Sequence, residues 1–163
     1  MYRAAVITLS DKGAKGERED ASGQVIWDIL TEAGYAVTER LLLSDDREGL
    51  AAELRRIADN HLADLILTTG GTGFSPRDNT PEATMDVVER PVPGIAEAMR
   101  VSSLQITRRA MLSRAVSGIR KRTLIINLPG SPKAVKEGLS YLIDTLEHGL
   151  AVLAGMDGEC AGK

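Results

Sequence analysis

The sequence ADLILTTGGTG, residues 63–73, joins an apolar run to three glycines within four positions. We interpret residues 63–69 as a buried strand that ends at Gly70 and Gly71. Glycine tolerates positive φ and lets the backbone approach a ligand closely, and successive N–H groups in such a loop can form an anion-binding nest. The loop is neither a Walker A motif nor a dinucleotide fingerprint. An ordinary tight turn explains the same glycines, so both interpretations stay open for the loop alone.

Apolar runs at residues 4–9 and 123–127 predict further strands, and residues 35–43 and the short segment 115–118 are also interpreted as strands. Between them, apolar residues recur at helical spacing. These stripes are Val25, Ile26, Ile29, Leu30 and Ala33; Leu50, Leu54, Ile57 and Ala58; and Val135, Leu139, Leu142, Ile143, Leu146, Leu150 and Leu153. Alternating strands and helices predict an α/β fold, a three-layer α/β/α sandwich with a mostly parallel sheet.

Helix starts are marked by capping residues. Thr80-Pro81 predicts a cap followed by proline at the first helical position, in a helix that runs to about Glu89. Pro93-Gly94 begins a helix that reaches about residue 104, and Ser131-Pro132 begins the last one. Asp45 and Glu48 have the spacing of a capping box, which predicts Asp45 as a helix cap.

Length and composition indicate one globular domain. The chain has 163 residues, of which 43% are hydrophobic and 26% charged. We expect a single domain at residues 1–154 and a short tail at 155–163. No apolar run approaches a membrane span, and the apolar run at 4–9 ends too early for a signal peptide, so we expect a cytoplasmic protein with no membrane contact. Cys160, His61 and His148 form no zinc pattern.

The charge balance argues against a dedicated nucleic-acid binder. The net charge is −3 and only 3% of residues are aromatic. The basic residues 120–122 are best explained as an exposed turn between two strands. Together with Arg108 and Arg109 they also permit the alternative of a nucleic-acid or partner-binding module.

Polar residues follow the strands of the predicted sheet. They are Ser10-Asp11, Ser44-Asp45-Asp46, the residues 68–73 followed by Arg77-Asp78, and Asn127 to Ser131. Ligands of open α/β folds bind outside the carboxyl ends of the strands, so we expect these segments to share one rim. Asp78 is either a favourable charge at the next helix start or a ligand of Mg²⁺ opposite a bound phosphate. Asp45 can combine capping with metal binding.

Together these segments resemble the molybdopterin adenylyltransferase family of molybdenum cofactor biosynthesis, the MogA/MoaB family, which includes the G domains of gephyrin and of plant Cnx proteins. The resemblance covers nearly the whole chain. Its motifs are residues 8–11, 44–46, 68–83, 93–94, 111–114 and 127–135. Ser44 departs from the proline that many relatives have before the aspartate.

The resemblance implies Mg²⁺-dependent transfer of AMP from ATP to the phosphate of molybdopterin, with release of pyrophosphate. It implies catalysis by Asp45 and Asp78, also the expected metal ligands. With the polar rim, it leads us to expect substrate binding by Ser10, Asp11, Gly70, Gly71, Thr72, Gly73, Arg77, Ser103, Ser113, Asn127, Pro129, Gly130 and Ser131. It further implies a homotrimer, with a hexamer as an alternative, and a downstream molybdenum-insertion protein as partner. A non-catalytic molybdopterin-binding paralogue or a trimeric scaffold is the second hypothesis.

Overall fold

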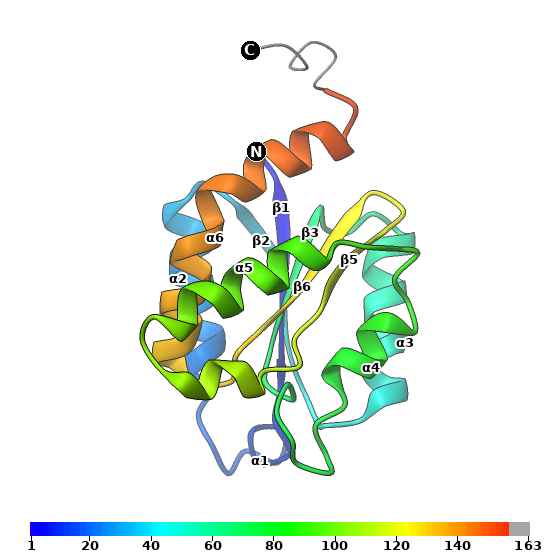
Figure 1. Ribbon diagram of the computed structural model, residues 1–163. Coiled ribbons are helices and arrows are strands. Elements are labelled where there is room, and N and C mark those ends of the chain that lie inside the picture. Colours follow the sequence, from blue (N-terminus) through cyan, green and yellow to red (C-terminus); the bar gives the residue numbers. More distant parts are fainter. Residues whose placement is uncertain (157–163) are drawn as a thin grey trace.

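Six strands form one mostly parallel sheet in the computed structural model, which describes residues 1–156 (Figure 1). The strand order is β2-β1-β3-β6-β5-β4. The first four strands in this order run parallel, β5 is antiparallel to β6, and β4 is antiparallel to β5. The strands are β1 (Arg3–Leu9), β2 (Ala36–Leu43), β3 (Leu65–Thr69), β4 (Arg90–Pro91), β5 (Ser117–Arg120) and β6 (Thr123–Leu128). The predicted mostly parallel α/β sheet is confirmed.

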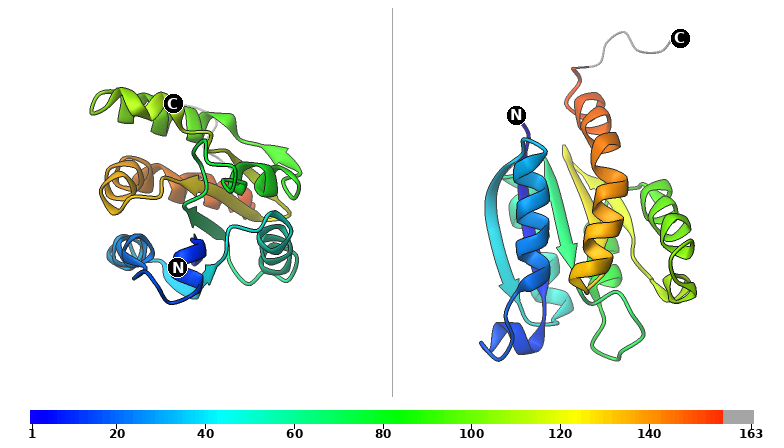
Figure 2. Two further views of the ribbon diagram at one scale, coloured as in Figure 1. Left: turned by 90° about the horizontal axis from the view of Figure 1, so that it is seen from below. Right: turned by 90° about the vertical axis from the view of Figure 1, so that its left-hand side faces the viewer.

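Helices cover both faces of the sheet and make the outer layers of the sandwich (Figure 2, left). They are α1 (Asp11–Ala14), α2 (Ala21–Glu32), α3 (Arg47–Asp59), α4 (Thr80–Met85), α5 (Pro93–Leu104), the 3₁₀ helix η1 (Arg108–Leu112) and α6 (Pro132–Leu153). Helices α2, α5 and α6 lie on one side and α3 and α4 on the other. Within residues 1–156, no helix is both long and apolar enough to cross a membrane.

The central strands β1, β3 and β6 are buried on both faces, which explains their nearly continuous apolar sequences. In β1, Ala4 and Val6 pack into one core cluster with side chains of α2, α5 and α6. Ala5 and Ile7 belong to a second cluster with side chains of α3 and α4. Of the basic residues 120–122, Lys121 and Arg122 form the predicted exposed turn between β5 and β6, while Arg120 is the last residue of β5 and pairs with Asp59.

Two helix caps differ from the prediction. Asp46, not Asp45, caps α3: its carboxylate accepts the Gly49 N–H at 2.7 Å, because the chain turns after β2 and the helix begins one residue later than the capping-box spacing predicts. Thr80 is the first residue of α4 rather than its cap, and its hydroxyl donates to the Gly70 carbonyl at 2.9 Å. That helix ends at Met85 rather than near Glu89.

One predicted strand lies two residues further along the chain. The strand expected at 115–118 lies at Ser117–Arg120. The expected tail from residue 157 onward, with Cys160, lies outside the described residues.

Candidate active site at the carboxyl ends of the strands

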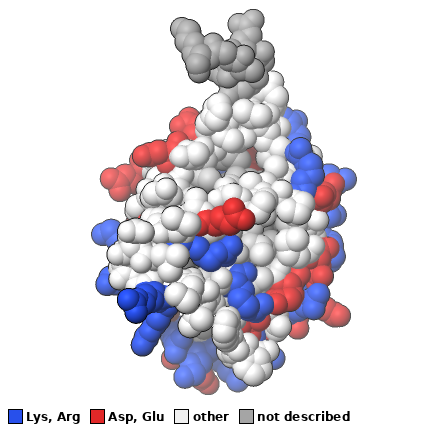
Figure 3. Space-filling model, viewed as in Figure 1, with Lys and Arg blue, Asp and Glu red and all other residues white. Residues whose placement is uncertain are grey.

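The parallel strands end on one edge of the sheet, at the bottom of Figure 1. Thr8, Thr69 and Leu128 lie in register near the ends of β1, β3 and β6. The loops that follow these strands, and the loop after β2, therefore reach the same rim, as the sequence predicts. Basic side chains gather on the lower part of the face shown in Figure 3, toward this rim.

The glycine loop after β3 needs its glycines. Gly70 has φ +93°, and a Cβ there would lie 2.4 Å from the Leu9 carbonyl oxygen. Gly71 has φ +70°, and a Cβ there would lie 2.2 Å from the Thr80 hydroxyl oxygen. Any side chain would therefore collide with β1 or α4, in a backbone conformation that L-residues rarely adopt. This packing places the loop against the carboxyl ends of β3 and β1.

One cavity of about 520 Å³ holds both candidate acids. Asp45 and Asp78 line it from opposite loops, and Ser10, Gly70, Gly71, Gly130 and Ser131 complete the predicted part of its wall. Both carboxylates lie beside the glycine loop: a Cβ on Gly71 would be 3.5 Å from Asp45 Oδ1, and one on Gly73 would be 2.9 Å from Asp78 Oδ2. The N-terminal ends of α2 and α6 also border this cavity. The positive ends of both helix dipoles therefore lie at the cavity, where Asp20 caps α2 and Ser131 caps α6.

Asp45 is held by a reciprocal pair of hydrogen bonds. The Asp11 N–H donates to Asp45 Oδ2, and the Asp45 N–H donates to Asp11 Oδ1, each at 3.0 Å. Arg77 in turn donates two hydrogen bonds of 2.8 Å to the Asp11 carboxylate. Burial raises the pKa of Asp45, and the negative charges of Asp11 and Asp78 raise it further. By contrast, hydrogen bonding from Arg77 lowers the pKa of Asp11 to about 2.

These carboxylates fit a magnesium ion by their chemistry. Mg²⁺ takes one or two carboxylates together with water and phosphate oxygens, and Asp45 and Asp78 offer two carboxylates in one cavity. A cation between them would offset the charge repulsion that raises the pKa of Asp45. Among residues 1–156, no cluster of three His, Cys, Asp or Glu residues forms a self-contained metal site.

A second cavity, of about 530 Å³, lies on the other side of the glycine loop. Thr72, Gly73, Ser103, Ser113, Pro129 and Ser131 line it, all of them predicted site residues. Ser131 therefore borders both cavities. Three cations, Arg100, Arg109 and Lys133, also line the second cavity and suit an anionic ligand. Arg100 was missed as a site residue, because a single arginine within a helical stripe carries no signal of a ligand.

Three predicted site residues line neither cavity. Asn127 is fully buried, and its amide nitrogen donates to the hydroxyls of Thr68 and Thr84 at 3.0 and 2.9 Å. Its side-chain oxygen accepts the Val116 N–H, so Asn127 ties the core together instead of facing a ligand. The other two are Asp11 and Arg77, which pair with each other beside Asp45.

Comparisons with known proteins show the family and the fold of the chain. A family described as "Probable molybdopterin binding domain" matches residues 5–148. The molybdopterin adenylyltransferase of Helicobacter pylori (strain J99) is 39% identical over 92% of this chain and 86% of its own. The molybdopterin adenylyltransferase of Escherichia coli (strain K12) is 39% identical over 87% of this chain and 74% of its own. The crystal structure of the molybdopterin biosynthesis enzyme MoaB from Thermus thermophilus matches with a TM-score of 0.90 and 46% identity, over 95% of this chain and 98% of that one.

Proposed function

The chain belongs to the molybdopterin-binding domain family of molybdenum cofactor biosynthesis, and we propose that it is a molybdopterin adenylyltransferase. In the proposed reaction, a phosphate oxygen of molybdopterin attacks the α-phosphorus of ATP. A new P–O bond forms, the bond to the β-phosphate oxygen breaks, and pyrophosphate leaves. The products are adenylyl-molybdopterin and pyrophosphate.

One observation carries this proposal: two cavities of similar size flank the same glycine loop and share Ser131. The cavity with Thr72, Ser103 and Ser113 is assigned to molybdopterin, and the cavity with the two acids to ATP. The phosphate of one substrate then meets the triphosphate of the other beside Ser131. A reaction between two polyanions depends on alignment and charge neutralisation more than on a covalent nucleophile.

The chain's own residues bind and orient the reacting groups. The N-terminus of α6, where Ser131 caps the helix, places the positive end of the helix dipole beside the boundary between the cavities, where a phosphate would bind. Asp45 and Asp78 would hold Mg²⁺, which supplies charge neutralisation on the phosphates when bound. The contacts with Asp11 keep the Asp45 carboxylate on the cavity side of its loop.

The remaining features of the proposal concern context. We propose one catalytic domain at residues 1–154, with 155–163 as a tail, working in the cytoplasm and passing its product to a molybdenum-insertion protein. We further propose a homotrimer. Large apolar side chains exposed on α5, η1 and the segment between them, among them Val101, Ile106 and Met111, support association with further copies of the chain.

The test is pyrophosphate release by the purified protein given molybdopterin, ATP and Mg²⁺, with Asp78→Asn in parallel. We expect release by the parent protein, and a much lower kcat with nearly unchanged molybdopterin affinity in the variant, because Asp78 lies in the other cavity. Unchanged turnover in Asp78→Asn would overturn its catalytic assignment. Tight molybdopterin binding without any pyrophosphate release by the parent would instead favour a binding paralogue or scaffold.

A further inference from the structure

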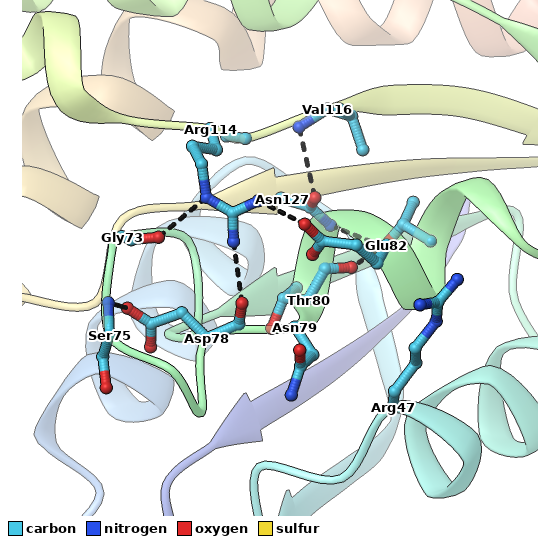
Figure 4. Close-up of polar contacts among 12 residues, drawn as sticks. Arg47, Gly73, Ser75, Asp78, Asn79, Thr80, Glu82, Arg114, Val116 and Asn127 are labelled. Atoms are coloured by element: carbon cyan, nitrogen blue, oxygen red, sulfur yellow. Dashed lines mark hydrogen bonds and ion pairs between the residues drawn. The ribbon is translucent and has the colours of Figure 1, made fainter.

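The guanidinium of Arg114 contacts the two ends of the loop that carries Asp78 and the side chain of Glu82 (Figure 4). Arg114 directly follows Ser113, which lines the molybdopterin-side cavity. Its Nε donates to the Gly73 carbonyl at 2.8 Å, and its Nη2 donates to the Asp78 carbonyl at 2.7 Å. Its Nη1 pairs with the carboxylate of Glu82. The guanidinium thus contacts the start and the end of the loop that carries Asp78.

The backbone of Arg114 adds a third contact at the start of this loop. Its N–H donates to the Thr72 carbonyl at 2.9 Å. Between these anchors, residues 74–77 are exposed, and Asp78 closes a local turn by accepting the Ser75 N–H at 3.0 Å. Arg77 ties the exposed part of the turn to Asp11, whereas Arg114 ties both of its ends, at residues 72–73 and at the Asp78 carbonyl, to the segment before β5.

Glu82 gives the guanidinium a rigid support. It lies in the first turn of α4, and hydrogen bonding from Arg114 lowers its pKa, so the partner stays ionised. Helix α4 is in turn held to the sheet by the hydrogen bond from the Asn127 amide to the Thr84 hydroxyl. Thr84, Glu82 and Arg114 therefore link the Asp78 carbonyl to Asn127, near the carboxyl end of β6.

We propose that Arg114 is a positioning residue for adenylyl transfer, which holds the Asp78 carboxylate at the cavity it shares with Asp45 through the backbone of residues 73–78. The inference rests on the proposed function. Arginine is required because its planar guanidinium group donates to three acceptors at once. A lysine ammonium is a compact point charge and cannot span the Gly73 carbonyl, the Asp78 carbonyl and Glu82 in the same plane.

The first test is Arg114→Lys, with Arg120→Lys as a matched control. Like Arg114, Arg120 uses all three guanidinium nitrogens on one carboxylate and backbone oxygen: two contact the Asp59 carboxylate and one donates to the Val87 carbonyl, at the opposite end of β6. We expect kcat of Arg114→Lys to fall about 10- to 100-fold, the scale of a displacement near 1 Å. The KM for molybdopterin and the Tm should stay close to those of the control.

The second test places Arg114→Lys in the Asp78→Asn background. A residue that acts only through Asp78 adds little further loss once that carboxylate is gone. Non-additive loss supports the proposal, whereas an equal further loss of kcat in that background overturns it. If Arg114→Lys does not fold, Glu82→Gln takes its place, because it weakens the ion pair that holds the same guanidinium. Its loss of kcat is then compared in the parent and in the Asp78→Asn background.

The outcomes separate this inference from the proposed function. A parent protein without turnover refutes the proposed function itself. A fully active parent whose Arg114→Lys variant turns over as fast as Arg120→Lys refutes the positioning role alone.

Discussion

The adjacent aspartates Asp45 and Asp46 have different roles, and substituting them one at a time separates effects on catalysis from effects on folding. Asp46 is exposed and caps α3 through the Gly49 N–H. Asp45 is half-buried and lines the cavity with Asp78. The change with the clearest expected result is therefore Asp46→Ala against Asp45→Asn.

The magnitudes follow from these contacts. Loss of an aspartate cap costs about 0.5–2 kcal/mol, and each kcal/mol lowers the Tm of a chain this size by about 2–4 °C. We expect the Tm of Asp46→Ala to fall by the amount that this free-energy cost corresponds to, while its kcat stays equal to that of the parent protein. Asp45→Asn keeps an oxygen that accepts the Asp11 N–H and removes a charge that burial disfavours, so its Tm should stay the same or rise. Its kcat should fall about 10²- to 10³-fold, as when one contact to developing charge is lost.

Thermal unfolding and pyrophosphate release, measured on the same preparations, check both halves of this prediction. Asp46→Asn is the matched control, because it removes the same charge one residue away and asparagine is also a good cap. It should resemble the parent protein in both assays. A large loss of kcat in Asp46→Asn, with normal turnover in Asp45→Asn, would refute the assignment of these two residues.

Two further predictions concern acid and assembly. Hydrogen bonding from Arg77 lowers the pKa of Asp11 to about 2. The stability that this pair contributes is therefore present above about pH 4, where an unfolded aspartate is ionised, and is lost as the pH falls toward 2. The Tm difference between the parent protein and Asp11→Asn should shrink over that range, and a difference that stays constant down to pH 2 would contradict this prediction. Sedimentation equilibrium should give three times the chain mass of 17.5 kDa, and Val101→Glu with Met111→Glu should lower it, because both side chains are exposed and apolar; a monomeric parent would contradict the proposed trimer.

Much of the fold was predictable because the long elements have strong periodicity. Strands such as residues 4–9 are buried on both faces and therefore carry unbroken apolar runs. The elements that were not predicted are α1, β4 and η1, which have four, two and five residues. Such short segments form through tertiary contacts and leave no periodic pattern.

The rim of the site was predictable from topology, but its internal contacts were not. Because the strands are parallel, the segments after β1, β2, β3 and β6 meet at one edge of the sheet, independently of the side-chain contacts in these segments. In contrast, Arg114 reaches Gly73, Asp78 and Glu82 across 32 to 41 residues of sequence. Asn127 looked like a ligand-binding amide, yet its partners, Thr68 and Thr84, lie inside the core. Local sequence does not distinguish a buried amide that faces the core from one that faces a cavity.

The most direct test of the central claim follows the α-phosphate of ATP. The purified protein is incubated with molybdopterin, Mg²⁺ and ATP labelled at the α-phosphate, and the products are separated and quantified by mass spectrometry. The account predicts that the label moves to molybdopterin in equal amount with the pyrophosphate released, and that Asp78→Asn slows both together. Label that stays in ATP, or appears only as free AMP, would contradict adenylyl transfer.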